Sequence, residues 1–165
     1  MFIVFMGVSG CGKTTIGKKT AAILGVPFYE GDDYHPEENV EKMSQGISLT
    51  DEDRDGWLDT LSKLISEKVD DGESGVLSCS ALKKKYREKL RVDPERVCFI
   101  YLKGSYDLIW SRMQVRTGHY MPADLLKSQF DDLEEPENDF IVDIDQPPND
   151  VLDDVLAYLR CVGIN

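Results

Sequence analysis

Short apolar runs alternate along the chain with longer stretches in which apolar residues recur every three or four positions. The runs are rich in β-branched and aromatic residues, which is typical of buried strands, and the longer spacing is typical of helices with one buried face. The predicted strands cover residues 2–6, 28–29, 76–80, 97–102 and 140–144. The predicted helices cover residues 13–24, 36–46, 50–69, a segment entered at 81–87, 106–116, a short segment ending at 130, and 151–159. This alternation predicts an α/β fold with a parallel sheet covered by helices on both faces.

Residues typical of helix ends support several of these boundaries. Gly25 and Pro27 follow the first predicted helix and favour a stop there. Thr50 and Asp53 have the spacing of a capping box, with Asp in the position of the usual Glu, and Ser105 is expected to cap a later helix. No repeat or linker interrupts the pattern, so residues 1–165 are expected to form one domain.

The first predicted strand ends in a glycine-rich segment that fits a phosphate-binding loop. Gly7 is followed, after four residues, by Gly12, Lys13 and Thr14, where a helix is predicted to begin. Glycines let the backbone turn its N–H groups toward a polyphosphate, and a helix N-terminus favours negative charge. Lys13 is expected to reach the β- and γ-phosphates, and the Thr14 hydroxyl to bind Mg²⁺. The alternative is a glycine-rich turn with an ordinary lysine. The residues expected to bind the nucleotide are Gly7, Val8, Ser9, Gly10, Cys11, Gly12, Lys13, Thr14 and Thr15.

Charged side chains follow the second predicted strand and open the third predicted helix. Glu30, Asp32 and His35 come where a strand of an α/β sheet would end, at the edge where ligands bind. A polar turn that caps a helix starting at Pro36 is the alternative. Arg54 lies on the first turn of a helix, where a cation is unfavourable for the helix dipole, so it is a candidate ligand contact.

The net charge and the cysteine pattern limit the kinds of partner and the cellular location that are expected for this protein. The chain has 165 residues and a net charge of −12, which argues against nucleic acid or an anionic membrane as the partner. Basic residues are concentrated at 83–91 and 112–119, where they are candidates to bind anions, although Lys84 and Lys89 are expected on a solvated helix face. Four cysteines without a C-x-x-C pair, no long apolar run and no signal-peptide pattern predict a soluble intracellular protein with reduced thiols.

Several blocks of sequence, in order along nearly the whole chain, resemble the gluconokinase family. They are the phosphate loop 7–14, residues 31–36 (Gly-Asp-Asp-Tyr-His-Pro) with Asn39 and Lys42-Met43, residues 49–54 with Trp57-Leu58, residues 79–83 with Tyr86-Arg87, residues 99–104, Arg112 with Arg116 and His119, and residues 142–147. The His-Pro and Ser-Ala-Leu-Lys blocks separate gluconokinases from shikimate and nucleoside monophosphate kinases of similar fold.

The resemblance implies an ATP-dependent phosphotransferase that moves the γ-phosphoryl group to the 6-hydroxyl of D-gluconate. Because phosphoryl transfer depends on positioning and charge stabilisation, Mg²⁺ is also expected. It implies a P-loop kinase fold with a five-stranded parallel sheet of order 2-3-1-4-5, a substrate-binding segment at about 31–73 and a lid at about 112–130. The expected form is a cytoplasmic homodimer. Two alternatives stay open: a same-fold kinase for another small acceptor, such as shikimate or a nucleoside monophosphate, and a non-catalytic nucleotide-binding module.

Site residues are assigned from the matched positions. The resemblance gives catalytic roles to Lys13, Asp32 and Arg116, with Asp32 holding the accepting hydroxyl. Arg112 and Arg116 match lid arginines that would close on the phosphates. Thr14 and Glu30 would hold the metal, Glu30 standing where Asp is usual. The expected substrate-binding residues are Asp32, His35, Arg54, Ser80, Lys83, Arg87 and His119. Either Arg54 or Arg87, whose guanidinium groups can form paired hydrogen bonds, is expected to bind the gluconate carboxylate.

Overall fold

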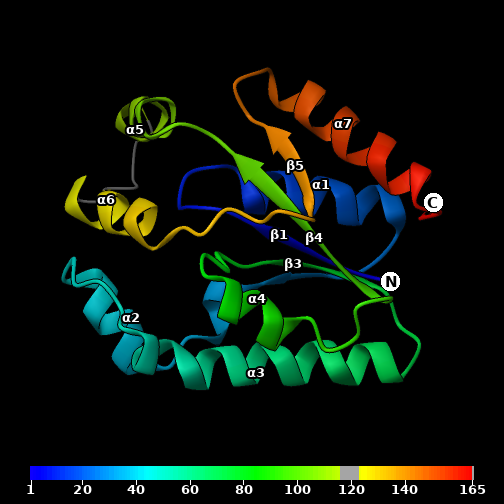
Figure 1. The fold of residues 1–165 in the computed structure, drawn as a ribbon, viewed down its shortest axis with the longest axis horizontal. Coiled ribbons are helices and arrows are strands. Elements are labelled where there is room, and N and C mark those ends of the chain that lie inside the picture. The colour runs from blue at the N-terminus through cyan, green and yellow to red at the C-terminus, as the bar shows by residue number, and fades with distance from the viewer. Residues whose placement is uncertain (116–122, 165) are drawn as a thin grey trace.

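A single parallel sheet forms the centre of the fold. The computed structural model describes residues 1–115 and 123–164. Neighbouring strands pair in parallel, in the order β2-β3-β1-β4-β5 (Figure 1). The strands are β1 (Phe2–Met6), β2 (Phe28–Glu30), β3 (Gly75–Ser78), β4 (Val97–Lys103) and β5 (Phe140–Asp143). The predicted parallel sheet of order 2-3-1-4-5 is therefore confirmed.

Helices cover both faces of the sheet. α1 and α7 pack on one face, and α3 and α4 pack on the other (Figure 1). The bounds of these helices are α1 (Lys13–Leu24), α3 (Asp51–Asp70), α4 (Lys84–Leu90) and α7 (Pro148–Cys161). Within the described residues, no helix is both long enough and apolar enough to cross a membrane.

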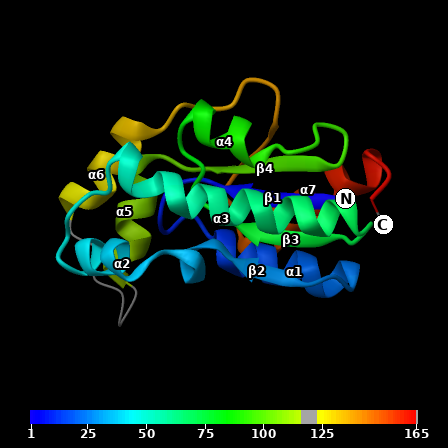
Figure 2. The same ribbon diagram turned by 90° about the horizontal axis from the view of Figure 1, so that it is seen from below.

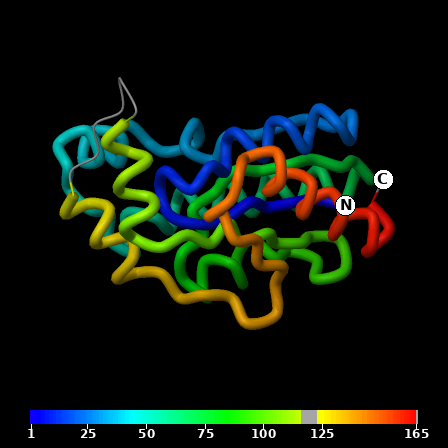
Figure 3. Tube along the Cα trace, turned by 90° about the horizontal axis from the view of Figure 1, so that it is seen from above, coloured from blue at the N-terminus to red at the C-terminus, as the bar shows by residue number. Residues whose placement is uncertain are grey.

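The remaining helices gather at one end of the sheet. Figures 2 and 3 show α2, α5 and α6 at the end toward which the strands run. Their bounds are α2 (Glu37–Ser44), α5 (Tyr106–Val115) and α6 (Ala123–Asp132), and a 3-10 turn, η1 (Gly31–Tyr34), follows β2. In open α/β sheets, ligands bind at the carboxyl ends of the strands. The arrangement thus places these helices around the expected ligand edge.

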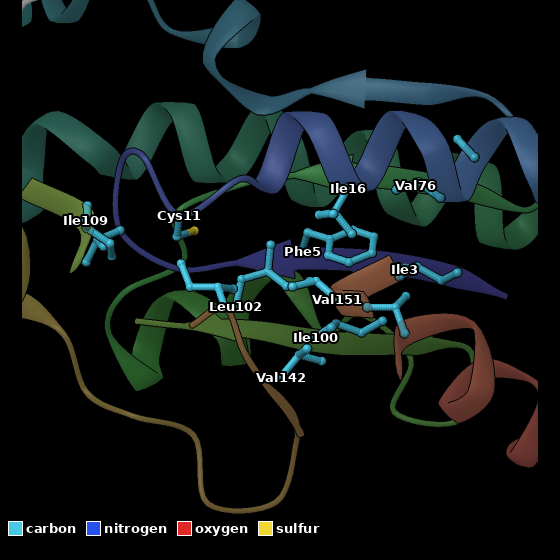
Figure 4. Packing of buried hydrophobic residues seen from close by; sticks show 14 of the residues in the cluster. Ile3, Phe5, Cys11, Ile16, Val76, Ile100, Leu102, Ile109, Val142 and Val151 are labelled. Carbon is cyan, nitrogen blue, oxygen red and sulfur yellow. The ribbon is translucent and has the colours of Figure 1, made fainter. Parts of the chain in front are cut away.

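The core lies on both sides of β1, whose five side chains are all buried. Because successive side chains of a strand point to opposite faces, Ile3 and Phe5 pack with α1 and α7, and the other three pack with α3 and α4. Figure 4 shows the first cluster, with Phe5 beside Ile16 of α1. A strand buried on both faces has a continuous apolar sequence, which explains why this strand was predictable.

The phosphate loop has the backbone that its glycines predict. Gly7, Gly10 and Gly12 have φ angles of +138°, +81° and +102°, a region that other residues rarely adopt. A Cβ atom on Gly7 would lie 2.8 Å from Cys11 Sγ and 2.9 Å from the carbonyl oxygen of Leu102. Glycine is therefore required at this turn both by its φ angle and by the close approach of β4.

Both predicted helix caps are present. The Thr50 hydroxyl accepts a hydrogen bond from the Asp53 N–H at 3.2 Å, and an Asp53 carboxylate oxygen accepts one from the Thr50 N–H at 2.9 Å. The second Asp53 oxygen accepts from Lys42 Nζ at 2.6 Å, which ties α2 to the start of α3. The Ser105 hydroxyl accepts from the Leu108 N–H at 3.2 Å.

Several boundaries differ from the sequence prediction by one to three residues. β3 ends at Ser78 instead of residue 80, because the chain leaves the sheet in a turn where Ala81 has a φ of +43°. That turn delays the start of α4 to Lys84. α7 begins at Pro148, three residues earlier than predicted, with proline in the first helical turn, where its missing N–H costs no hydrogen bond.

Candidate active site

The phosphate loop joins the end of β1 to the start of α1. Lys13 folds back over it, and its Nζ donates hydrogen bonds to the carbonyl oxygens of Gly7 and Val8, both at 3.0 Å. At the first turn of α1, the Thr14 hydroxyl donates to Glu30 Oε2 at 2.7 Å. The loop therefore brings an ammonium group, a hydroxyl and the carboxylate at the end of β2 to one helix N-terminus.

One side of the loop borders a cavity of about 270 Å³. Arg112 of α5 lines this cavity, and its Nη2 donates to the carbonyl oxygen of Ile144 at 2.6 Å. Part of its wall comes from the turn after β5 and from the start of α7, neither of which was assigned to the site from sequence. The lining residues are Gly10, Cys11, Gly12, Thr15, Ile16, Arg112, Ile144, Gln146, Pro148 and Val151.

A second cavity, of about 200 Å³, borders the phosphate loop at Ser9 and Lys13. Four residues that were predicted to bind substrate line it: Asp32, His35, Arg54 and Ser80. Sequence reasoning missed the rest of its wall, which comprises Met43, Leu49, Trp57, Leu82, Leu125, Ser128 and Gln129. Lys13 thus lies between the phosphate loop and a cavity with mixed polar and apolar walls.

Asp32 lies in the η1 turn, and its side chain is 77% exposed. The turn is fixed from behind, because the Trp57 indole N–H donates to the carbonyl oxygen of Gly31 at 2.8 Å. A Cβ atom on Gly31 would lie 2.4 Å from the carbonyl oxygen of Ser78, so only glycine fits against β3 here. These contacts hold the Asp32 carboxylate at the mouth of the cavity on a rigid turn.

His35 is held in one orientation by two neighbours. Its ring stacks on Trp57 with centroids 4.1 Å apart, and Asn39 Nδ2 lies 3.3 Å from its Nδ1. The same Nδ2 donates to the carbonyl oxygen of Asp53 at 2.7 Å, which identifies it as the amide nitrogen and makes Nδ1 of the imidazole the acceptor. In the neutral ring the proton is therefore on Nε2, 3.9 Å from Asp32 Oδ1.

Burial, and then the charge of Arg54, lower the pKa of His35 to about 4. At neutral pH the imidazole is uncharged, so its approach to Asp32 is not an ion pair. His35 can then donate a hydrogen bond from Nε2 without adding charge to the cavity. Asn39, which fixes this tautomer, is 3% exposed and was not assigned to the site from sequence.

Arg54 reaches the cavity from the first turn of α3, with its side chain 10% exposed. Its Nη1 donates to Asp132 Oδ2 at 3.1 Å and to the Tyr86 hydroxyl at 3.2 Å. Lys83 lies just outside the cavity lining, where its Nζ contacts Asp51 at 2.9 Å and Asp132 at 3.4 Å. Hydrogen bonds from Lys85, Tyr86 and Lys83, in that order, hold the pKa of Asp51 well below its usual range.

Arg87 is not part of the second cavity. It is 5% exposed, and its Nη1 donates to the carbonyl oxygens of Ala81 and Leu82 at 3.1 and 3.0 Å. Burial lowers the pKa of this guanidinium group. The side chain therefore supports the turn that carries Ser80, and its outer edge faces a separate cleft lined by residues 134–139. The predicted site residues Arg116 and His119 lie outside the described residues.

The fold and these two cavities define a class of protein. A phosphate loop with its lysine and hydroxyl is suited to hold a polyphosphate, and a second cavity beside that lysine offers a carboxylate, a neutral imidazole and a guanidinium group to another small molecule. Phosphoryl transfer needs donor and acceptor to be held in this way. The arrangement is that of a small-molecule kinase with a P-loop.

Comparisons with known proteins identify the family. Residues 9–156 match the shikimate kinase family. The thermosensitive gluconokinase of Escherichia coli K12 is 52% identical over 136 residues, which are 82% of this chain and 73% of that protein. The gluconokinase of Gluconobacter oxydans is 44% identical over 162 residues, covering 96% of this chain and 91% of that protein. The chain belongs to the gluconokinases, within the shikimate kinase family of P-loop enzymes.

Solved structures agree with this assignment. The crystal structure of a gluconokinase from Sinorhizobium meliloti 1021 has a TM-score of 0.90 and 44% identity, and the match covers 97% of this chain and 91% of that one. Shikimate kinase from Aquifex aeolicus, at 20% identity and a TM-score of 0.62, shares the fold.

Proposed function

We propose that this enzyme transfers the γ-phosphoryl group of ATP to the 6-hydroxyl of D-gluconate, giving 6-phosphogluconate and ADP. The observation that carries the proposal is the second cavity, because it adjoins Lys13 and holds Asp32, His35 and Arg54 together. These side chains suit a small acid with a row of hydroxyl groups. The gluconokinase relatives, at 40–52% identity, support the same acceptor.

In the proposed reaction, the Asp32 carboxylate accepts the proton of the 6-hydroxyl as the hydroxyl oxygen forms a bond to the γ-phosphorus. The bond between that phosphorus and the β,γ-bridging oxygen breaks, and ADP leaves. Lys13 turns from the loop carbonyls to the β- and γ-phosphates and neutralises charge on the transferring group. Asp32 is suited to this role because it stands on a rigid turn at the mouth of the cavity.

We assign the gluconate carboxylate to Arg54. Arg54 lines the cavity, whereas Arg87 is occupied by two backbone carbonyls beside another cleft. A guanidinium group can form two parallel hydrogen bonds with a carboxylate. His35 Nε2 and the Ser80 hydroxyl are suited to bind hydroxyl groups of gluconate, and Lys83 adds positive charge close to the cavity wall.

Mg²⁺ fits the pair formed by Thr14 and Glu30. One hydroxyl and one carboxylate meet at the loop, which is the kind of donor set that Mg²⁺ uses when phosphate oxygens and water complete its shell. Bound there, the ion would neutralise phosphate charge. Across the loop, Arg112 borders the first cavity, which we assign to the nucleotide.

We further propose that residues 31–73 form the substrate-binding segment and that residues 112–130 form a lid carrying Arg116 and His119. The homodimer and the cytoplasmic location expected from the family stay predictions. The two alternative functions are less well supported. A non-catalytic module would not need a second cavity with an exposed carboxylate beside Lys13.

An ADP-release assay with gluconate, shikimate and a nucleoside monophosphate tests the proposal. We expect turnover with gluconate, and turnover with shikimate alone would contradict it. Asp32→Asn should lower kcat by about 10²- to 10⁴-fold, the range for losing a general base. Asp33→Asn is the matched control, because this neighbouring carboxylate is exposed and does not line the cavity. Full turnover by Asp32→Asn would remove the role given to that carboxylate.

A further inference from the structure

One face of α6 is directed at both halves of the site. Leu125, Ser128, Gln129 and Asp132 have the spacing of one helix face, and the first three line the second cavity. Ser128 Oγ lies 2.8 Å from Ser48 Oγ, and Asp132 pairs with Arg54 at 3.1 Å. Between them, Gln129 Oε1 accepts a hydrogen bond from the Ser9 N–H of the phosphate loop at 2.6 Å. Gln129 therefore touches the nucleotide side while facing the acceptor cavity.

The contact with Ser9 fixes the orientation of the Gln129 amide. A backbone N–H can only donate, so the side-chain atom 2.6 Å away must be the carbonyl oxygen. The Nε2 atom, with two N–H donors, is then on the other arm of the planar amide. In residues 1–115 and 123–164 it has no protein acceptor. The cavity that Gln129 lines is the space in which these donors can find one.

We propose that Gln129 is a further substrate-contacting residue of the kinase, whose Nε2 donates a hydrogen bond to the acceptor molecule while Oε1 is anchored on Ser9. This inference rests on the proposed function and extends it to a residue on α6. The anchor sets the position of the acceptor relative to the phosphate loop, and the uncharged amide adds a donor without opposing the negative charge of either substrate. Misplacing reactants by a fraction of an ångström is costly in phosphoryl transfer, which depends mainly on positioning.

A purely structural role for Gln129 would have different consequences for its variants. If Gln129 only fastened α6 to the loop, any side chain that still accepts from the Ser9 N–H would suffice. Gln129→Glu keeps the length of the side chain and an oxygen that can accept from Ser9, but it replaces the N–H donor with an anionic oxygen. Gln129→Met keeps the length of the side chain without charge and removes both hydrogen bonds. The two variants therefore separate the anchor from the donor.

The test is steady-state kinetics of the full-length enzyme, with ATP and gluconate varied separately. We expect both variants to raise the gluconate KM or lower kcat, so that kcat/KM for gluconate falls at least about 30-fold, with the ATP KM within about threefold of the parent value. Melting temperatures should stay within a few degrees. Asp131→Asn is the control, because this carboxylate lies on the exposed side of α6 and pairs only with Lys127 among the described residues.

The outcomes separate this inference from the proposed function. Parent-like kcat/KM for gluconate in Gln129→Glu or Gln129→Met would overturn the donor role. A loss that falls equally on ATP and gluconate, with a matching loss of thermal stability, would also overturn it in favour of a structural role. If the parent enzyme uses another acceptor in place of gluconate, the proposed function fails and the same variants are measured with that acceptor. An enzyme inactive toward every acceptor overturns both.

Discussion

The nucleotide side and the acceptor side of this site are built differently. The phosphate loop is one continuous segment that offers backbone N–H groups, one lysine and one hydroxyl to a ligand. The acceptor cavity collects side chains from η1, α2, α3, the turn after β3 and α6, which are far apart in the sequence. A backbone site depends on where glycines permit a turn, whereas a side-chain site depends on how whole elements pack. The first can be recognised from a short motif, and the second, in the function proposed here, also decides which acceptor is used.

Removing Lys13 should produce the largest effect and should not depend on the acceptor. In Lys13→Met we expect kcat to fall by about 10³-fold, because the cation that neutralises charge on the transferring phosphoryl group is lost. Lys18→Met is the control, since Lys18 is exposed on α1. Turnover is measured by ADP release with each acceptor that the parent enzyme uses. A loss confined to one acceptor would mean that Lys13 belongs functionally to the acceptor cavity.

Replacing each of the two candidate arginines separately should produce smaller effects, and only the Arg54 variant should affect the use of gluconate. Arg54→Gln is expected to raise the gluconate KM about 100-fold while leaving the ATP KM unchanged, because a charged partner of the substrate carboxylate is lost. Arg87→Gln should mainly lower the melting temperature, since the turn at Ala81 loses two hydrogen bonds. If Arg87→Gln raised the gluconate KM and left the melting temperature unchanged, our assignment of the carboxylate would be reversed.

Protonation of His35 should produce the smallest effect, and it acts on stability. The pKa of His35 is lowered to about 4 in the folded protein, against about 6.5 in an unfolded chain. Between these values the unfolded chain binds a proton that the folded chain does not. The free energy of unfolding therefore falls as the pH decreases from 6.5 toward 4. The stability that comes from keeping His35 neutral in the folded state is fully present above pH 6.5.

The measurement is denaturant unfolding of the parent and of His35→Gln at pH 6.5 and pH 5. The parent should lose about 2 kcal/mol more than the variant over this interval. An equal loss in both would show that His35 takes up a proton in the folded state. Activity should show no His35-dependent change between pH 6 and 8, because the imidazole stays neutral there.

The difference between the two sides also explains what could be predicted from sequence. The sheet order was predicted from the family resemblance. The strands were predicted from apolar runs and the phosphate loop from the spacing of its glycines, which are local features of the sequence. Asp32, His35, Arg54 and Ser80, which were predicted to bind substrate, line one cavity, and their roles stay predictions. Lys83 and Arg87 do not line the cavity, because Lys83 pairs with Asp51 and Asp132 and Arg87 donates to the carbonyls of Ala81 and Leu82, contacts that the sequence does not signal. Gln129 was missed because nothing in α6 marks the face that meets the loop.

Trp57 places a fluorescent side chain in the wall of the second cavity. Its indole is 2% exposed, stacks on His35 and binds the turn that carries Asp32, so its surroundings depend on what occupies the cavity. The chain has one other tryptophan, Trp110 on α5, which stacks near Tyr106. The enzyme therefore carries one intrinsic fluorophore at the acceptor and another on α5, whose last turn carries Arg112 of the nucleotide cavity. Trp57 emission is therefore expected to change when a small molecule fills the second cavity, without any added label.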